Sequence, residues 1–165
     1  KPGRTYCLMA PSGAGKTTLF RILLGLESPD SGTIHGLSDH RISAVFQEDR
    51  LLEGYTALQN LRLVTGRQYT NTELANILLT LFPEDALKKP ICEFSGGMKR
   101  RTAILRALLA PSSFLIMDEP FTGLDYETRL KTIGLIKEYT RGKIFLVSTH
   151  LEEDVSLLEA RLIHL

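Results

Sequence analysis

The sequence has little that would place the protein outside ordinary globular proteins: it has no tryptophan, only two cysteines and no long hydrophobic run. Cys7 and Cys92 do not form a disulfide framework, so we expect a reducing compartment. With 20 Lys and Arg against 19 Asp and Glu, it lacks the basic footprint of nonspecific nucleic-acid binding, and we expect no nucleic-acid partner. Its longest apolar segments, such as residues 114–117 and 144–147, are far shorter than the ~20 residues of a membrane helix.

What the sequence does contain is typical of a folded domain. Its 165 residues are 43% hydrophobic and 24% charged, and a chain of this length buries roughly 70% of its unfolded surface. We therefore predict one domain over residues 1–165.

Short β-type runs alternate with helical segments, which predicts an α/β fold with a mainly parallel central sheet flanked by helices. Residues 54–94 differ, because Thr70 and Glu73 form a capping box and leucines and isoleucine recur after them at helical spacing. We interpret this part as a mostly helical insertion, a helical subdomain over about 54–110. The β-type runs are residues 5–10, 42–46, 114–117 and 144–148.

A glycine-rich segment joins the first β-type run to a predicted helix over 16–26. Strand, glycine-rich loop and helix in this order are the context of a P-loop, whose backbone N–H groups wrap phosphates. Lys16 would reach the β- and γ-phosphates and the Thr17 hydroxyl would bind Mg²⁺. The alternative, a plain turn before a core helix, leaves the Lys16-Thr17 spacing to chance, and Ala10 in place of the motif's first glycine is a mild departure. The residues expected to hold the nucleotide are Pro11, Ser12, Gly13, Ala14, Gly15, Lys16, Thr17 and Thr18.

Two carboxylates follow the apolar run 114–117. Open α/β sheets place their ligands at the carboxyl ends of strands, so we expect Asp118 to hold Mg²⁺ and Glu119 to act as the general base for an attacking water. The alternative is a solvated turn before Pro120.

A second anion site is predicted at Ser95, Gly96 and Gly97. Serine is a good N-cap, and the two glycines leave the first N–H groups of the following helix open. We expect the basic residues 99–101 to form a solvated face that needs no ligand.

The segment 94–101 resembles the signature sequence of the ATP-binding cassette family of transporter ATPases. The P-loop, Gln47, residues 94–101, Asp118-Glu119, residues 122–125 and His150 stand in that family's order along nearly the whole chain.

This resemblance implies an ATPase that uses ATP and Mg²⁺. It implies that Gln47 contacts Mg²⁺ and the lytic water, and that His150 contacts the γ-phosphate and orients that water. Asp125 would cap a helix and communicate across a dimer. One domain cannot bring both anion sites to one nucleotide, so the partner would be a second ATPase subunit, whose ATP meets Ser95, Gly96 and Gly97.

The resemblance also implies transmembrane permease subunits as partners and a cytoplasmic location, peripheral on the cytoplasmic face of the membrane. Residues 48–94 are too few for the coiled-coil arm of chromosome-maintenance relatives, which favours a transporter subunit. The segment 45–52 and the Ser-Gly-Gly-Met form of the signature resemble importers of the nitrate, sulfonate and taurine group. Leu51, Leu52 and Tyr55 would receive a helix of the permease.

Two other functions remain open: a nucleotide-dependent dimerising regulatory module with little turnover, and a P-loop kinase. A kinase function would leave the signature sequence and His150 unexplained.

Members of the ATP-binding cassette family precede the P-loop with strands carrying an aromatic residue that stacks on adenine, and Tyr6 is too close to Lys16 for that role. We therefore expect truncated N-terminal strands, a truncated C-terminal end and weakened nucleotide affinity.

Overall fold

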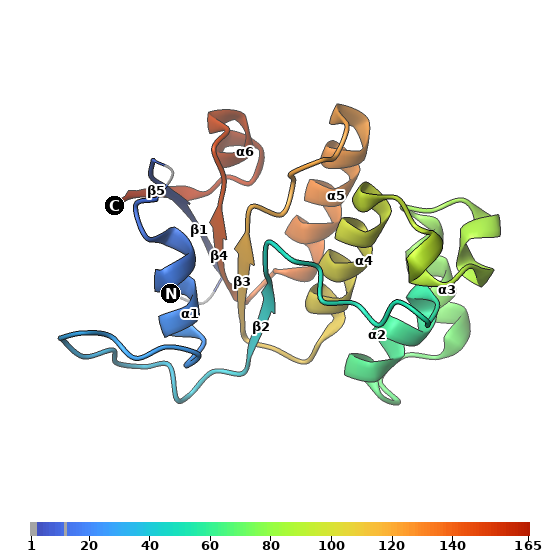
Figure 1. Cartoon of the computed structure of the whole chain (residues 1–165), viewed down its shortest axis with the longest axis horizontal. Coiled ribbons are helices and arrows are strands. Elements are labelled where there is room, and N and C mark those ends of the chain that lie inside the picture. Colours follow the sequence, from blue (N-terminus) through green and yellow to red (C-terminus); the bar gives the residue numbers. More distant parts are fainter. Residues whose placement is uncertain (1–2, 12) are drawn as a thin grey trace.

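A five-stranded sheet forms the centre of the part of the chain that the computed structural model describes, residues 3–11 and 13–165 (Figure 1). The strand order is β2-β3-β4-β1-β5, and each neighbouring pair is parallel. The parallel α/β architecture predicted from the sequence is therefore confirmed. The strands are β1 (Arg4–Met9), β2 (Ile42–Val45), β3 (Phe114–Asp118), β4 (Ile144–Ser148) and β5 (Arg161–His164).

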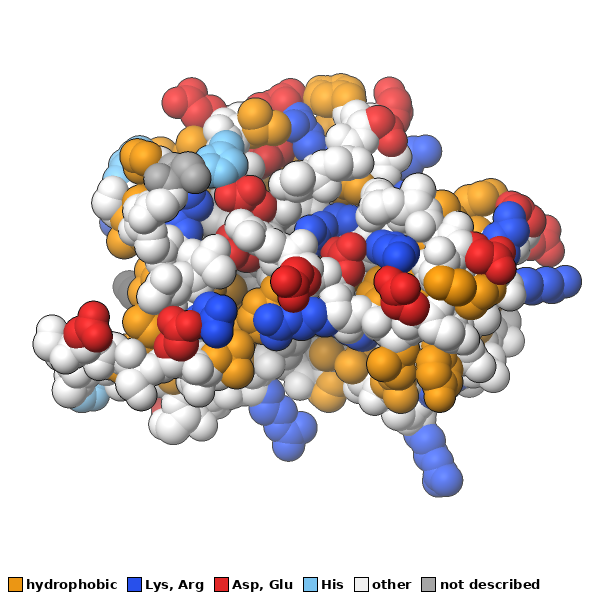
Figure 2. Space-filling view, in the orientation of Figure 1, with side chains coloured by type: hydrophobic (Ala, Val, Ile, Leu, Met, Phe, Trp, Pro, Cys, Tyr) orange, Lys and Arg blue, Asp and Glu red, His pale blue; other side chains and the backbone are white. Residues whose placement is uncertain are grey.

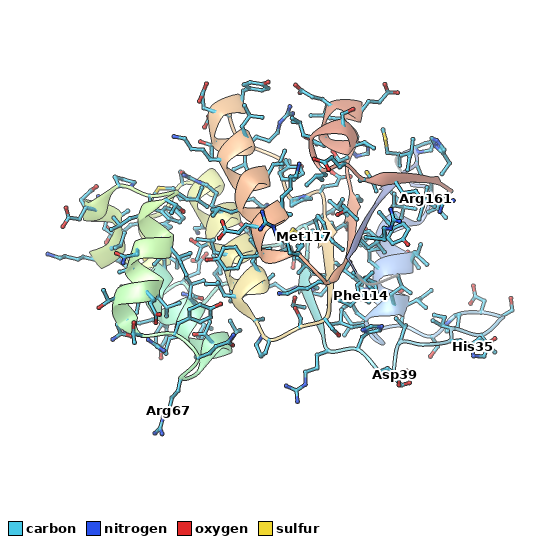
Figure 3. The ribbon with its side chains drawn as sticks, turned by 180° about the vertical axis from the view of Figure 1, so that it is seen from behind. His35, Asp39, Arg67, Phe114, Met117 and Arg161 are labelled. Carbon is cyan, nitrogen blue, oxygen red and sulfur yellow. The ribbon has the colours of Figure 1, made fainter. Side chains whose placement is uncertain are left out.

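The interior strand β3, between β2 and β4, is buried along its whole length because helices cover both faces of the sheet. Side chains alternate between the faces of a strand. Phe114 and Ile116 pack with Phe20 of α1 (Lys16–Leu23) in one core cluster. Leu115 and Met117 belong to the larger cluster, which includes residues of α4 (Gly96–Leu109) and α5 (Tyr126–Tyr139). Phe114 and Met117 are labelled toward opposite ends of β3 in the view from behind (Figure 3).

Helix α1 is shorter than predicted and ends at Leu23. Gly25 adopts a φ of 69°, and the N–H groups of Gly25 and Leu26 donate to the carbonyls of Ile22 and Arg21. This pair of bonds is the Schellman arrangement, which stops a helix at a left-handed glycine. The exposed connection that follows extends away from the sheet and carries His35 and Asp39 (Figure 3).

Between β2 and β3 the chain is mostly helical. The predicted capping box is present, because Thr70 and Glu73 each accept from the other's backbone N–H. Leu61, Leu74 and Leu78 are fully buried here. The separate subdomain over 54–110 stays a prediction. The elements of this region are α2 (Ala57–Thr65), α3 (Asn71–Leu79), the 3₁₀ turns Glu84–Lys88 and Ile91–Glu93, and α4; the last helix of the chain is α6 (Glu152–Leu157).

None of the helices in the described part of the chain is both long enough and apolar enough to span a bilayer.

Candidate nucleotide-binding and hydrolysis site

The loop between β1 and α1 offers backbone N–H groups, rather than side chains, to a ligand. Gly13 and Gly15 have φ values of 82° and 92°, a conformation that strains residues with a Cβ. Gly15 is also the N-cap of α1, so no cap side chain covers the first N–H groups of the helix. Open N–H groups at a helix N-terminus bind anions such as phosphate. Ser12, predicted to share this role, lies outside the described residues.

Lys16 places its ammonium group inside this loop. The residue is 7% exposed, and its Nζ donates to the carbonyl oxygens of Ala10 at 2.8 Å and Pro11 at 3.2 Å. These carbonyls hold the cation where a phosphate cradled by the loop would meet it.

The loop opens into a pocket of about 210 Å³ that brings together residues far apart in the sequence. Gln47 enters it from the end of β2 and Glu119 from the end of β3. The remaining lining comes from the P-loop segment, so predicted phosphate-binding residues, the predicted base and two of the three predicted Mg²⁺ ligands, Thr17 and Gln47, share one cavity. The lining residues are Gly13, Gly15, Lys16, Thr17, Thr18, Gln47 and Glu119.

Asp118 does not itself line this pocket but is hydrogen-bonded to Thr17, which does. It is 3% exposed, its Oδ2 accepts a hydrogen bond from the Thr17 hydroxyl at 2.7 Å, and its Oδ1 accepts one from Ser148 at 2.6 Å. Thr17, Asp118 and Gln47 supply oxygen atoms and a single carboxylate, the kind of set that binds Mg²⁺ together with phosphate oxygens and water. The predicted Mg²⁺ ligands therefore fit the ion in their chemistry.

Glu119 has a strained backbone. Its φ is 48°, a left-handed conformation that costs a residue other than glycine about 1–3 kcal/mol. Its N–H donates to the Ser148 hydroxyl at 2.9 Å, and its Oε1 lies 2.5 Å from His150 Nε2. This backbone turns the carboxylate toward both the nucleotide pocket and the histidine, the arrangement expected of a base with an orienting partner.

His150 borders a second, smaller cavity of about 90 Å³ together with Glu119 and Asp154. Asp154 is fully buried, and burial raises its pKa, although the Thr149 hydroxyl donates to it at 2.5 Å and Arg129 lies nearby. Arg129 forms ion pairs with Asp154 at 3.5 Å and with Glu153. The segment that carries His150 is thus tied to α5.

The signature residues form a separate cluster, and none of them lines the nucleotide pocket. Ser95 caps α4 as predicted, accepting from the Met98 N–H at 3.3 Å, and Ser95 and Gly96 are exposed. A Cβ on Gly97 would lie 3.3 Å from the Gly123 carbonyl oxygen, so this helix start packs closely against residues 122–125.

Asp125 caps α5, as predicted. Its carboxylate accepts from the Thr128 N–H at 2.9 Å, and hydrogen bonding to Thr128 holds the pKa of Asp125 below its ordinary value.

The predicted solvated basic face at residues 99–101 is wrong for Arg100. Its side chain is buried: one nitrogen donates to the Phe46 carbonyl at 2.6 Å, another donates to the Gln47 carbonyl, and it pairs with Asp49 at 3.2 Å. Arg106 donates to the carbonyls of Asp49 and Arg50. Helix α4 therefore holds the segment that begins at Gln47.

Lys99 and Arg101 are also engaged. Lys99 pairs with Glu53 at 2.8 Å, and Arg101 donates to the Leu81 carbonyl. The prediction failed because buried backbone carbonyls on neighbouring segments need donors, and those segments cannot be located from the sequence of one helix.

Sequence analysis also missed Ser148. A serine that ends an apolar strand, at the edge of the sheet where parallel strands place ligands, was the available signal.

The fold and pocket define the class of protein: a P-loop nucleotide-binding protein. The profile of the ABC transporter family matches residues 1–122. The chain is 38% identical to a Nod factor export ATP-binding protein I of Paraburkholderia xenovorans and 36% identical to the aliphatic sulfonates import ATP-binding protein SsuB of Delftia acidovorans. Each match covers 98% of this chain. The chain belongs to the ABC transporter family.

Solved structures agree with this assignment. A dimeric ATP-binding cassette in a post-hydrolysis state, bound to ADP and Pi, superimposes with a TM-score of 0.83 at 29% identity. That match covers all of this chain and 82% of the other. The chain spans 58% of the length of the Nod factor relative and 68% of the sulfonate relative.

Proposed function

We propose that this chain binds MgATP, hydrolyses it, and powers a transporter through ATP-driven head-to-tail dimerisation. The observation that carries the proposal is the pocket that the P-loop shares with Gln47 and Glu119. Two of its lining residues are held from outside it, because Thr17 bonds to Asp118 and Glu119 pairs with His150. The family, and relatives named ATP-binding proteins for export and for import, support the link to transport.

Each side chain has a task in this proposal. The loop N–H groups and Lys16 bind the phosphates, and Thr17, Gln47 and Asp118 would hold Mg²⁺, which neutralises phosphate charge when bound. Glu119 accepts a proton from the attacking water, and His150, 2.5 Å from its carboxylate, keeps the base oriented. The Glu119–His150 pair favours turnover over a regulatory module that only binds nucleotide.

Dimerisation is proposed because the signature cluster lies outside the pocket that the same chain offers to ATP. Ser95 and Gly96 are exposed at the start of α4, where N–H groups are available to an anion. A head-to-tail pair would bring the cluster of each chain to the nucleotide of the other. The similar ATP-binding cassette, whose structure is a dimer, supports this arrangement.

A permease is the proposed membrane partner, which would hold the chain peripherally on the cytoplasmic face of the membrane. Figure 2 shows hydrophobic side chains gathered over α2, among charges of both signs elsewhere on that face. This surface includes Leu63 in α2, which is 60% exposed, and two residues before the helix, Leu52 at 44% and Tyr55 at 50%. We propose that a permease helix covers part of this apolar surface.

Glu119→Gln tests the proposal, because the amide keeps the shape of the side chain but cannot accept the proton. We expect the parent chain to hydrolyse MgATP, and the variant to lose hydrolysis while still binding ATP and forming a dimer with it. Phosphate release and the molecular mass in solution, with and without ATP, measure this. Glu127→Gln, on the exposed first turn of α5, is the matched control.

Hydrolysis by Glu119→Gln at the parent rate would contradict the role of the base. A parent that binds ATP and dimerises without releasing phosphate would support the regulatory module instead. A parent that neither binds ATP nor dimerises would contradict the proposal as a whole.

We propose import as the direction of transport, on the resemblance of residues 45–52 and the signature to sulfonate-type importers and on the similarity to an aliphatic sulfonates import protein. Deleting the coding region should abolish growth of the host on aliphatic sulfonates as sole sulfur source. Normal growth of the deletion strain would contradict a role in sulfonate import.

A further inference from the structure

Ser148 occupies a special place in the sheet. It is the last residue of β4, the strand that lies between β1, which leads into the P-loop, and β3, which leads into Asp118 and Glu119. In the register of the sheet it pairs with Leu8 on one side and Asp118 on the other. The residue is fully buried.

Its hydroxyl bridges the two carboxylate residues of the site. The O–H donates to Asp118 Oδ1 at 2.6 Å, and the same oxygen accepts from the Glu119 N–H at 2.9 Å. One small group thereby satisfies a buried acceptor and a partly buried donor on consecutive residues.

Each bond restrains a different degree of freedom. The bond to Oδ1 limits rotation of the Asp118 carboxylate, so that Oδ2 faces the Thr17 hydroxyl. The bond from the Glu119 N–H holds the backbone where φ is 48° and where the chain turns the base toward His150. One restraint acts on Glu119, which lines the nucleotide pocket, and the other on Asp118, which bonds to the lining residue Thr17.

We propose that Ser148 is a positioning residue that orients the Mg²⁺ ligand Asp118 and the general base Glu119 together. This inference rests on the proposed ATPase function and deepens it. A residue with a merely structural role would change the stability of the sheet and leave the dependence on Mg²⁺ untouched. A positioning residue changes kcat and the Mg²⁺ requirement, while ATP still binds the P-loop.

Ser148→Ala removes only the hydroxyl oxygen, so the buried site gains no bulk. Ser148→Thr keeps the hydroxyl. Ser43→Ala is the matched control: Ser43 is near the start of β2, and its hydroxyl bonds to that of Ser112, away from the carboxyl ends of the strands.

The experiment measures kcat and KM for MgATP, and the Mg²⁺ concentration that gives half of the full thermal shift with ATP present. For Ser148→Ala we expect kcat to fall and the half-maximal Mg²⁺ concentration to rise, each by about 10- to 100-fold, the range seen when groups that orient metal ligands are removed. We expect KM to change less than kcat, and Ser148→Thr to recover most of the loss.

Ser148→Ala values of kcat and Mg²⁺ requirement that match those of Ser43→Ala would overturn the inference while leaving the ATPase function intact. Parallel losses of ATP binding and thermal stability, with no change in Mg²⁺ requirement, would also overturn it. A parent without hydrolysis would instead contradict the proposed function, and the Mg²⁺ titration of ATP binding would still test Ser148.

Discussion

Single residues in this protein combine a local structural task with a place in the site. Asp125 ends the 122–125 segment that packs against Gly97, and its carboxylate caps α5. The backbone of Glu119 is strained, and this conformation directs the carboxylate to the pocket. Capping could be predicted for Asp125 because it depends on atoms three residues away. The strain at Glu119 could not, because it depends on where β4 and His150 lie.

The Asp125 cap predicts a pH dependence of stability. Hydrogen bonding to Thr128 lowers the pKa of Asp125 below its ordinary 3.8, so its stabilisation is fully present above that unfolded value and is lost as the pH falls through the lower folded value. Asn caps helices well but does not titrate. When the pH is lowered from 5 to below the folded pKa of Asp125, the melting temperature of Asp125→Asn should therefore fall less than that of the parent. Identical pH profiles would contradict this contribution.

At the scale of elements, α4 is the link between the signature and the Gln47 segment. Its start carries Ser95, and within the next three turns Arg100 and Arg106 hold the backbone carbonyls of residues 46–50. Burial raises the pKa of Asp49, and the positive charge of Arg100 opposes this. Hydrogen bonds and an ion pair therefore connect α4 to the backbone of the Gln47 segment.

Arg100→Met keeps the apolar stem but removes these bonds, leaving Asp49 without its ion-pair partner and the carbonyls of Phe46 and Gln47 without their donor. We expect the free energy of unfolding to fall by about 3 kcal/mol, as when one partner of a buried pair is removed. Urea unfolding measures it. Arg67→Met is the control, since Arg67 is exposed and points away from the molecule (Figure 3). Equal stability of the two variants would show that Arg100 is not a structural link.

At the scale of the whole molecule, the two cysteines differ in their accessibility to reagents in the folded state. Cys7 lies inside β1, is 0% exposed, and burial together with the negative charge of Asp154 raises its pKa to about 11. Cys92 is exposed. The thiolate is the reactive form, so the folded protein offers one reactive cysteine.

A thiol reagent at pH 8 should label Cys92 rapidly and Cys7 only when the sheet opens. MgATP should slow the labelling of Cys7 further, because a ligand of the native state lowers the unfolded population. Mass spectrometry of the labelled chain measures both rates, and Cys92→Ser should retain only the slow one. Labelling of both cysteines at one rate would contradict the burial of β1.

Much of this protein can be predicted from its sequence alone. The glycines of the P-loop, the capping box of Thr70 and Glu73, and the apolar runs of β3 and β4 are determined by interactions within a few residues, so their patterns are visible in the chain. The order of the motifs along the chain also indicates the family.

Only the tertiary structure decided which of these elements are neighbours. The order of parallel strands places Ser148 beside Asp118, although 30 residues separate them. Packing of α4 against the end of β2 turned Arg100 from an expected surface residue into a buried donor. Such pairings follow from burying both faces of one sheet at once, a condition on the whole chain that no short segment of sequence records.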